Sequence, residues 1–389
     1  MSELNASNLR KEHGNEGPDL VGTTELTSPY FMVPPSGTTA QRPQNPQKGT
    51  LRFNTDIGSL EYFKGDTIGW EQIVRTSPNL GGGTGSNTGT GVRGLHMGGF
   101  LNPGQSDVID YITIPTLGNA IDFGNLTAAN RVNGGCASRT RGISAGGYVG
   151  SISDVIQYVT ISSTGDALDF GDLTLERYNV AGLSNQIRGI FAAGEGSPNS
   201  WINIVDYITI AQTGNAVDFG DIQNQNGQIG QNNGVSSPTR GVIGGSYISP
   251  GAYVNTTGYV TISTTGDFVD FGDLTEARGR AGGIHNATRG IFTGGFTPGS
   301  TNTIDFITIS TLGNATDFGD QLYPAASLGC CSSPTRGTAA GGYNSPAGPT
   351  IVNTIGYLEI ATTGNLTDFG DLSVTRGQTR GISNGHGGL

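Results

Sequence analysis

The sequence predicts an all-β protein whose main part is a six-bladed β-propeller. The first observation is a repeat of about 50 residues that occurs six times between residues 93 and 388. Each copy contains apolar runs that alternate with polar residues and are rich in β-branched and aromatic side chains, which is typical of strands. Nothing in residues 80–389 has helical spacing over the roughly ten residues that a helix needs.

Each repeat contains three clear strands and a weaker fourth. The first strand opens with Arg-Gly and ends in glycines, as in RGIFTGGF from Arg289, and the second resembles TIDFITIS around Phe306. The third carries the phrase G-[ND]-x-x-D-F-G-[DN], whose Asp-Phe pairs lie at 122–123, 169–170, 218–219, 270–271, 317–318 and 368–369. The weaker strand is typified by AGGIHN at 281–286. Four strands make one propeller blade, and packing the blades around an axis buries apolar faces that isolated hairpins would leave wet.

The ends of the array indicate a closed ring. TRGQTRGISNGHGG at 375–388 aligns without gaps on ARGRAGGIHNATRG at 277–290, so the chain ends where a seventh Arg-Gly strand would begin. An outer strand in the glycine-rich stretch 81–91 is a candidate latch that would pair with the last blade. Seven blades are the alternative, if the N-terminal hairpin at 50–73 supplies most of another blade.

Three domains are expected: an extended arm at 1–49, a β-hairpin attachment module at 50–80 and the propeller at 81–389. The arm is polar except for SPYFMVPP at 28–35, so it should become ordered only against a partner. A lone hairpin is marginal in water and should also pack on something. The residues predicted to attach this region are Tyr30, Phe31, Met32, Phe53, Tyr62, Phe63 and Trp70.

The repeat resembles the kelch repeat of β-propellers, in which an apolar run and a double glycine precede a strand with a tyrosine. Here the kelch tryptophan is absent and Asp-Phe-Gly takes its place. The resemblance covers about three quarters of the chain and implies the fold more than the function, because kelch-like propellers include both binding modules and a copper oxidase.

A second resemblance concerns residues 42–74. The strings GTLRFNTD, LEYF and GWE look like a short β-module near the N-termini of bacteriophage tail-fibre and other virion proteins. Followed by repeats of this kind, the chain resembles virion structural proteins of marine and cyanobacterial tailed phages. The resemblance implies a peripheral fibre-like or appendage protein, made and assembled in the host cytoplasm, that docks by its N-terminal region and exposes its propeller. The alternatives are a capsid decoration protein and a host-glycan-binding lectin module.

The composition of the chain limits the classes of partner that it is expected to bind. The 389 residues include 66 glycines and only 13% charged side chains, and the net charge is −11. Nucleic-acid binding needs a basic face, and no segment approaches the roughly 20 apolar residues of a membrane span. We therefore expect other virion proteins (tail, neck or capsid) and a host-surface glycan as partners, with neither nucleic acid nor membrane. A homo-oligomer is expected, and a trimer is one option.

The repeated polar residues are expected to serve the fold. The aspartates should cap turns, and the Phe beside each should pack between blades; a ring of carboxylates that binds Ca²⁺ is the weaker alternative. The Arg-Gly arginines should pair with these aspartates between blades, or else ring one mouth of the channel as an anion site. The arginines are Arg93, Arg141, Arg188, Arg240, Arg289 and Arg336; the aspartates are Asp122, Asp169, Asp218, Asp270, Asp317 and Asp368.

No catalytic residue, cofactor or metal site is predicted. The four histidines lack the spacing of zinc or copper ligands, and Glu195, Glu276 and Glu359, which depart from the repeat, each stand alone in their copy. The loops after the double glycines vary most between copies and contain Trp201, Tyr247 and Tyr253 among Ser, Asn and Pro. Aromatic and small polar residues are typical of recognition surfaces and sugar-stacking sites, so these three are the candidate host-glycan contacts; loops that only fill space are the alternative.

Overall fold

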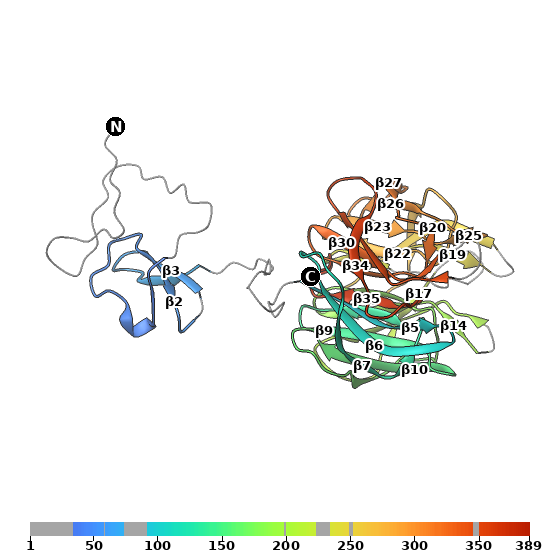
Figure 1. Ribbon diagram of the computed structural model, residues 1–389, viewed down its shortest axis with the longest axis horizontal. Helices are drawn as coiled ribbons and strands as arrows, with labels where there is room; N and C mark the ends of the chain where they lie inside the picture. The colour runs from blue at the N-terminus through green and yellow to red at the C-terminus, as the bar shows by residue number, and fades with distance from the viewer. Residues whose placement is uncertain are drawn as a thin grey trace. The chain divides into compact units, whose positions relative to one another are not determined.

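The computed structural model describes residues 34–57, 59–73, 92–197, 200–222, 234–248, 252–344 and 350–389. These residues are all-β (Figure 1), and within them the single helical element is the short 3-10 helix η1, Thr39–Gln41. The chain divides into two compact units, residues 1–77 and 78–389. Each unit is described by itself below.

The smaller unit contains one four-stranded sheet. Its order is β1 (Ser36–Gly37), β2 (Leu51–Asn54), β3 (Ser59–Phe63) and β4 (Trp70–Gln72). β1 is parallel to β2, whereas β2–β3 and β3–β4 are antiparallel. The predicted boundary after residue 49 does not match this sheet, because β1 belongs to the expected arm but pairs with the hairpin. The hairpin belongs to a sheet of its own, not to a blade of the larger unit.

The larger unit contains six four-stranded antiparallel sheets within its described residues. The first three are β35 (Arg380–Ser383), β5 (Arg93–Leu101), β6 (Gly104–Thr113), β7 (Ile121–Asn130); β8 (Gly134–Ala137), β9 (Arg141–Tyr148), β10 (Ile152–Thr160), β11 (Leu168–Asp172); and β12 (Ala181–Ser184), β13 (Arg188–Ala192), β16 (Ile204–Thr209), β17 (Val217–Asp221). The next three are β18 (Gly234–Ser236), β19 (Arg240–Ile248), β20 (Ala252–Thr261), β21 (Val269–Asp273); β22 (Gly282–His285), β23 (Arg289–Thr293), β26 (Thr303–Thr308), β27 (Thr316–Asp320); and β29 (Gly329–Ser332), β30 (Arg336–Ala340), β33 (Thr354–Glu359), β34 (Thr367–Asp371).

Short strands extend some of the loops that join the two central strands of a sheet, and one further short strand, β28 (Ala325–Ala326), lies in the connector between the last two sheets. They are β14 (Glu195–Gly196) with β15 (Ser200–Trp201), β24 (Phe296–Thr297) with β25 (Gly299–Ser300), and the three-stranded group of β28, β31 (Tyr343–Asn344) and β32 (Thr350–Ile351).

The double glycines are required by a close backbone approach. Gly146 has φ +61°, and a Cβ there would lie 2.5 Å from the carbonyl oxygen of Arg177 in the connector to the next sheet. Gly98, Gly245 and Gly341 face the same obstruction. In the third sheet Ala193 holds this conformation, with φ +58°. The left-handed backbone turns the chain out of the core strand and into the variable loop.

Each sheet is joined to the next by the same backbone hydrogen bond. The glycine N–H of one G-[ND] turn donates to the phenylalanine carbonyl of the preceding sheet over 2.8–3.0 Å. The six links are Gly165 to Phe123, Gly214 to Phe170, Gly266 to Phe219, Gly313 to Phe271, Gly364 to Phe318 and Gly118 to Phe369. Followed in order, they return to the first sheet.

The C-terminal strand completes the first sheet. β35 pairs antiparallel with β5 in the register Ile382↔Leu95, and Figure 1 shows the red β35 beside the cyan β5. It occupies the place that β8, β12, β18, β22 and β29 hold in the other five sheets. The candidate latch at 81–91 lies outside the described residues. The latch that the structure describes therefore comes from the other end of the chain.

The apolar core consists of six clusters, and each cluster joins two neighbouring sheets. The phenylalanine of each Asp-Phe-Gly phrase is 2–3% exposed and belongs to one of them, which confirms that it packs between sheets. These residues are Phe123, Phe170, Phe219, Phe271, Phe318 and Phe369.

Candidate functional site: an aromatic pocket on the variable loops

An aromatic ring lies at the start of the variable loop in five sheets, directly after the double glycine in four of them and after Gly244-Gly245-Ser246 in the sheet of β19. These half-buried residues are Phe100, Tyr148, Tyr247, Phe296 and Tyr343. In the third sheet the corresponding phrase is Ala193-Gly194-Glu195, so a carboxylate stands where the other copies have a ring. Glu195 thus marks one sector as chemically different.

Two hairpins bring the predicted loop aromatics together. Glu195 and Trp201 are directly opposite in β14–β15, and Tyr247 and Tyr253 are directly opposite in β19–β20. Residues opposite each other across an antiparallel pair project from the same face, so each hairpin presents two side chains together. The ring centroids of Trp201 and Tyr247 are 5.9 Å apart, and those of Tyr247 and Tyr253 are 5.0 Å apart.

Arg280 adds a cation to this cluster. It lies in the connector between β21 and β22 with φ +60°, and Val132, Asn179, Ser327 and Gln378 have the same left-handed backbone in other connectors. The left-handed backbone is therefore a common feature of the connectors. Among the described connectors, an arginine occupies this position only between β21 and β22. Its Cζ lies 5.5 Å from the centroid of Phe296, and burial lowers the pKa of its guanidinium below the ordinary 12.5.

Glu195, Trp201, Tyr247, Tyr253 and Arg280 line a cavity of about 300 Å³, called here the Trp201 pocket. Burial, and then a hydrogen bond to Glu195, raise the pKa of the neighbouring Tyr178 phenol. Backbone bonds between Tyr178 and Glu195 in both directions hold this side of the pocket. Aromatic walls with a few polar groups, at this volume, are typical of small-ligand sites.

Sequence reasoning selected Trp201, Tyr247 and Tyr253, and the structure brings all three into one cavity. It noted Glu195 as a break in the repeat but did not connect it with Trp201, and it missed Arg280. The available signal was positional: Glu195 replaces the aromatic residue that follows the double glycine directly in four copies and after Ser246 in a fifth.

The Arg-Gly arginines do not form the expected ion pairs with the repeated aspartates. Each guanidinium lies over the Tyr or Phe ring of the adjacent strand, with its Cζ 4.3–4.8 Å from the ring centroid. Each also donates to an isoleucine carbonyl of the next sheet, at 2.8–3.3 Å; for example, Arg141 donates to Ile210. Arg336 additionally pairs with Glu359 at 2.9 Å. Stacking and carbonyl contacts satisfy these cations between sheets.

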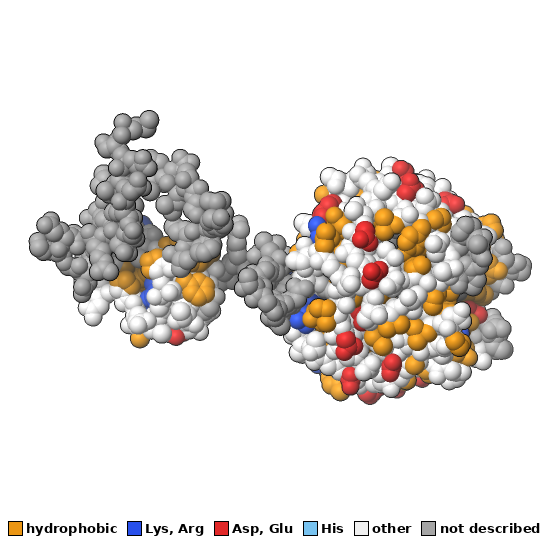
Figure 2. Space-filling model, viewed as in Figure 1, with side chains coloured by type: hydrophobic (Ala, Val, Ile, Leu, Met, Phe, Trp, Pro, Cys, Tyr) orange, Lys and Arg blue, Asp and Glu red, His pale blue; other side chains and the backbone are white. Residues whose placement is uncertain are grey.

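Each repeated aspartate is the second residue of the third strand in its repeat and is exposed. Their side chains make no hydrogen bond or ion pair within the described parts of the chain. The capping that was expected of them is provided instead by the Asn or Asp of the G-[ND] turn. Asn215, for example, accepts from the Asp172 N–H of the preceding sheet at 3.1 Å. Figure 2 shows acidic side chains scattered over the visible face of the larger unit.

Three fully buried ion pairs were not predicted. Arg177–Asp206, Arg278–Asp305 and Arg376–Asp110 join alternate pairs of sheets at 2.8–2.9 Å, and all six side chains are 0% exposed. At the position of these aspartates the other three copies have Gln157, Gly258 and Gly356. A buried ion pair therefore occurs at every second connection between neighbouring sheets.

Residues of β8, β12, β18, β22, β29 and β35 line a cavity of about 40 Å³, which has room for a few water molecules. The C-terminal segment contributes to its wall: His386 Nε2 lies 2.9 Å from the Ala137 carbonyl, and the Gly387 N–H donates to the His285 carbonyl. Burial lowers the pKa of His386 to about 4 and that of His285 to about 3.

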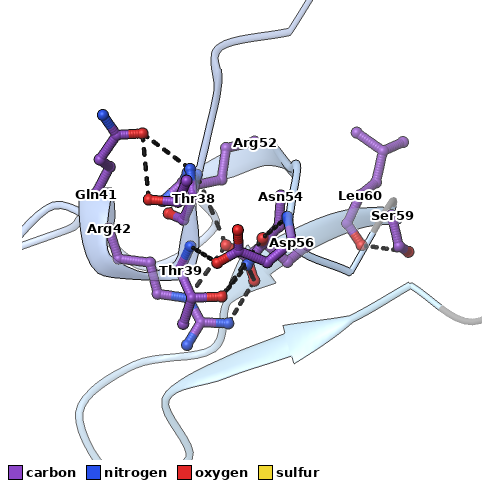
Figure 3. A network of polar contacts seen from close by, with 10 residues as sticks. Thr38, Thr39, Gln41, Arg42, Arg52, Asn54, Asp56, Ser59 and Leu60 are labelled. Atoms are coloured by element: carbon purple, nitrogen blue, oxygen red, sulfur yellow. Dashed lines mark hydrogen bonds and ion pairs between the residues drawn. The ribbon is translucent and has the colours of Figure 1, made fainter.

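The two faces of the smaller sheet have opposite character. On one face Glu61 is buried and accepts hydrogen bonds from Arg42 at 2.5 and 3.1 Å and from Asn54 at 3.1 Å. Figure 3 shows Arg42 and Asn54 beside Thr39, whose N–H donates to Asp56 at 2.8 Å. On the other, Leu51 is opposite Tyr62 and Phe53 is opposite Leu60, all exposed or half-buried.

The remaining predicted attachment residues differ in their placement. Phe63 is buried with its ring 5.6 Å from that of Trp70, over which Arg42 and Arg52 also lie. Tyr30, Phe31 and Met32 lie outside the described residues.

Two further findings concern the described ranges as a whole. They contain no group of three or more His, Cys, Asp or Glu side chains placed to hold a metal ion. They also contain no helix long and apolar enough to cross a membrane. Comparison with models of known protein families finds no match, and curated proteins show no significant sequence match either.

Proposed function

We propose that the larger unit is a closed six-bladed β-propeller. We further propose that the protein is a non-catalytic appendage of a tailed-phage particle, docked through its N-terminal region with its variable loops exposed. The observation that carries the fold is the cycle of six equivalent glycine-to-phenylalanine hydrogen bonds, together with a C-terminal strand that completes the first sheet. Repetition of the arginine and phenylalanine contacts at every sheet interface supports a structural role for the repeat.

The docking role rests on the inverted faces of the smaller sheet. A soluble four-stranded sheet normally buries its apolar face, but this one buries the face on which Glu61, Arg52 and Asn54 accompany Phe63. Leu51 remains 39% exposed beside the half-buried Phe53, Leu60 and Tyr62. This face is suited to burial against another protein. The likeness of residues 42–74 to an N-terminal virion module supports a particle protein as that partner.

A capsid decoration protein remains the alternative position within the particle. A carbohydrate-binding role for the loop face is favoured by a specific observation, the gathering of Trp201, Tyr247 and Tyr253 around one cavity. An appendage that exposes this cavity combines both roles, because docking and recognition use different units of the chain.

Incorporation into particles tests the docking proposal. Particles are produced with the full chain carrying Phe53→Asp and Leu60→Asp, and purified particles are analysed by mass spectrometry. We expect the variant to fold but to be lost from particles, whereas Val269→Asp, an exposed position on β21, is incorporated normally. Absence of the wild-type protein from particles, or normal incorporation of the Phe53/Leu60 variant, would overturn the proposal.

A further inference from the structure

We propose that the Trp201 pocket binds a sugar unit that carries a carboxylate group. This inference rests on the proposed function, because it names the ligand class that an exposed loop face would recognise. The pocket combines three tilted aromatic rings, one guanidinium and one carboxylate within about 300 Å³.

The pocket occurs where the repeat is broken. Four sheets place an aromatic residue directly after the double glycine, the sheet of β19 places Tyr247 one residue later, after Ser246, and the third sheet places Glu195 at this point. An aromatic ring is present instead on the opposite strand of the hairpin, where Trp201 is directly opposite Glu195. Neither residue is needed by the fold at this position, since the other copies form the same strands without them. The presence of both a carboxylate and an indole in this one loop, where the fold needs neither, indicates that the loop recognises a ligand.

The aromatic residues favour a sugar over a flat or fully apolar ligand. Trp201, Tyr247, Tyr253 and Phe296 form a chain of rings with neighbouring centroids 5.0–5.9 Å apart and interplanar angles of 53–59°. Tilted rings of this kind enclose a rounded ligand, whose C–H groups pack on the ring faces while its hydroxyls reach polar neighbours. The volume lies at the lower end of the range for ligand pockets and fits a small saccharide unit.

Arg280 specifies the carboxylate. In the described part of the chain its guanidinium stacks on Phe296 but has no hydrogen bond or ion pair. A guanidinium pairs with a carboxylate through two parallel hydrogen bonds, and the apolar surroundings strengthen that pair. Burial lowers the pKa of Arg280, which indicates a partly desolvated cation that an anion would stabilise.

Glu195 limits how much negative charge the ligand carries. Its hydrogen bond with Tyr178 fixes the carboxylate, whose remaining lone pairs can accept sugar hydroxyls. It also repels a second anionic group, as does the net charge of −11 on the chain. One carboxylate among neutral hydroxyls therefore fits better than a polyanion or an acidic peptide.

The test measures binding of methyl glycosides to the full chain by calorimetry and saturation-transfer NMR. The acidic panel contains the methyl glycosides of glucuronic, galacturonic and N-acetylneuraminic acid, and the neutral panel contains methyl glucoside and methyl galactoside. We expect at least one acidic glycoside to bind about tenfold or more tightly than the neutral ones. Arg280→Met should abolish this discrimination, Arg280→Lys should keep part of it, and Trp201→Ala should weaken binding of every ligand.

Arg131→Met is the matched control. Arg131 also stacks on loop-face rings, 5.2 Å from Phe100 and 5.0 Å from Tyr148, but it lies outside the Trp201 pocket. Binding should be unchanged in this variant, and circular dichroism should show that all variants fold.

Three results would overturn the inference: no binding by any acidic glycoside, equal binding by the neutral glycosides, or binding by a hexaglutamate peptide alone. Failure here leaves incorporation into particles unaffected. Conversely, if the chain binds acidic sugars but is absent from particles, the proposed function is wrong and the assignment of the Trp201 pocket as a sugar site still holds.

Discussion

Among single residues, the buried Arg–Asp pairs are the most consequential. Arg278 Nη2 lies 2.9 Å from Asp305 Oδ2, and the Thr275 N–H and hydroxyl also donate to this carboxylate. Taking both charges out of water is costly, and the ion pair with its hydrogen bonds offsets that cost, although Arg278 Nε and Nη1 have no hydrogen-bond partner among the described residues. Loss of one partner should therefore be far more damaging than loss of both.

Asp305→Asn should destabilise the larger unit by about 3 kcal/mol, because it leaves the Arg278 guanidinium buried without its counter-charge. The double variant Arg278→Met, Asp305→Leu should recover most of this loss. Urea unfolding of the full chain measures both. The matched control is Asp317→Asn, across from Asp305 on β27 but exposed, which should change stability by less than about 0.5 kcal/mol. Equal effects at the two positions would contradict the importance of the buried pair.

His386 should give the larger unit a pH-dependent stability. Its pKa is about 4 in the folded chain, because burial disfavours the charged ring, and 6.5 is the ordinary value. The unfolded chain therefore takes up the proton first, so stability is complete above pH 6.5 and falls as the pH decreases toward about 4. His386→Gln should reduce the slope of unfolding free energy against pH by at most about 1.4 kcal/mol per pH unit, measured by urea unfolding. An unchanged slope would show that the ring is not buried in the neutral form.

Some residue roles could be predicted from sequence and others could not. The Asp-Phe phenylalanine was predicted correctly because burial follows from an apolar residue repeated at one strand position. The partner of Arg93 was not, because it depends on register: Arg93 is opposite Thr113, which places Tyr111 on the diagonal. The Arg–Asp pairs left a visible signal, since Asp110, Asp206 and Asp305 occur in alternate copies, but their arginine partners lie in the connectors between sheets.

At the scale of elements, β35 is the strand on which the proposed closure of the ring depends. It supplies the innermost strand of the first sheet from the opposite end of the chain, and Ile382 lies in the cluster that also contains Leu95 and Met97. Alignment of the repeats predicted a copy of the weaker strand at the C-terminal end of the chain. That this strand pairs with β5 could be seen only in the structure.

A chain ending at Thr379 should lose stability in the larger unit, since β5 becomes a bare edge and its apolar residues lose packing. We expect a lower melting temperature and faster amide exchange in β5, measured by hydrogen exchange with mass spectrometry. Removal of Leu389 alone is the control and should leave β5 protected. Unchanged protection of β5 in the truncated chain would contradict closure by β35.

Across the whole molecule, two separate units predict two separable unfolding transitions. The stability of the smaller unit depends on Glu61. A hydrogen bond from Arg42 lowers the pKa of this carboxyl below its ordinary value of 4.5. The ionised carboxylate thus adds stability that is complete above pH 4.5 and is lost as the pH falls through the lower folded value.

Glu61→Gln should therefore lower the melting temperature of the calorimetric transition that belongs to the smaller unit and leave the transition of the larger unit unchanged. Glu71→Gln is the matched control, because Glu71 pairs with Lys64 at the exposed edge of the same sheet and contributes little. A single transition that shifts as a whole would show that the two units do not unfold independently.

Cryo-electron microscopy of the intact particle tests the central claim most directly. The account predicts a six-sheet ring at the periphery, with residues 1–77 buried against a tail, neck or fibre protein and the Trp201 pocket facing outward. Density for residues 1–77 along the capsid lattice would make this a decoration protein. A ring whose Trp201 pocket is covered by the particle, or no density for this protein at all, would contradict the account.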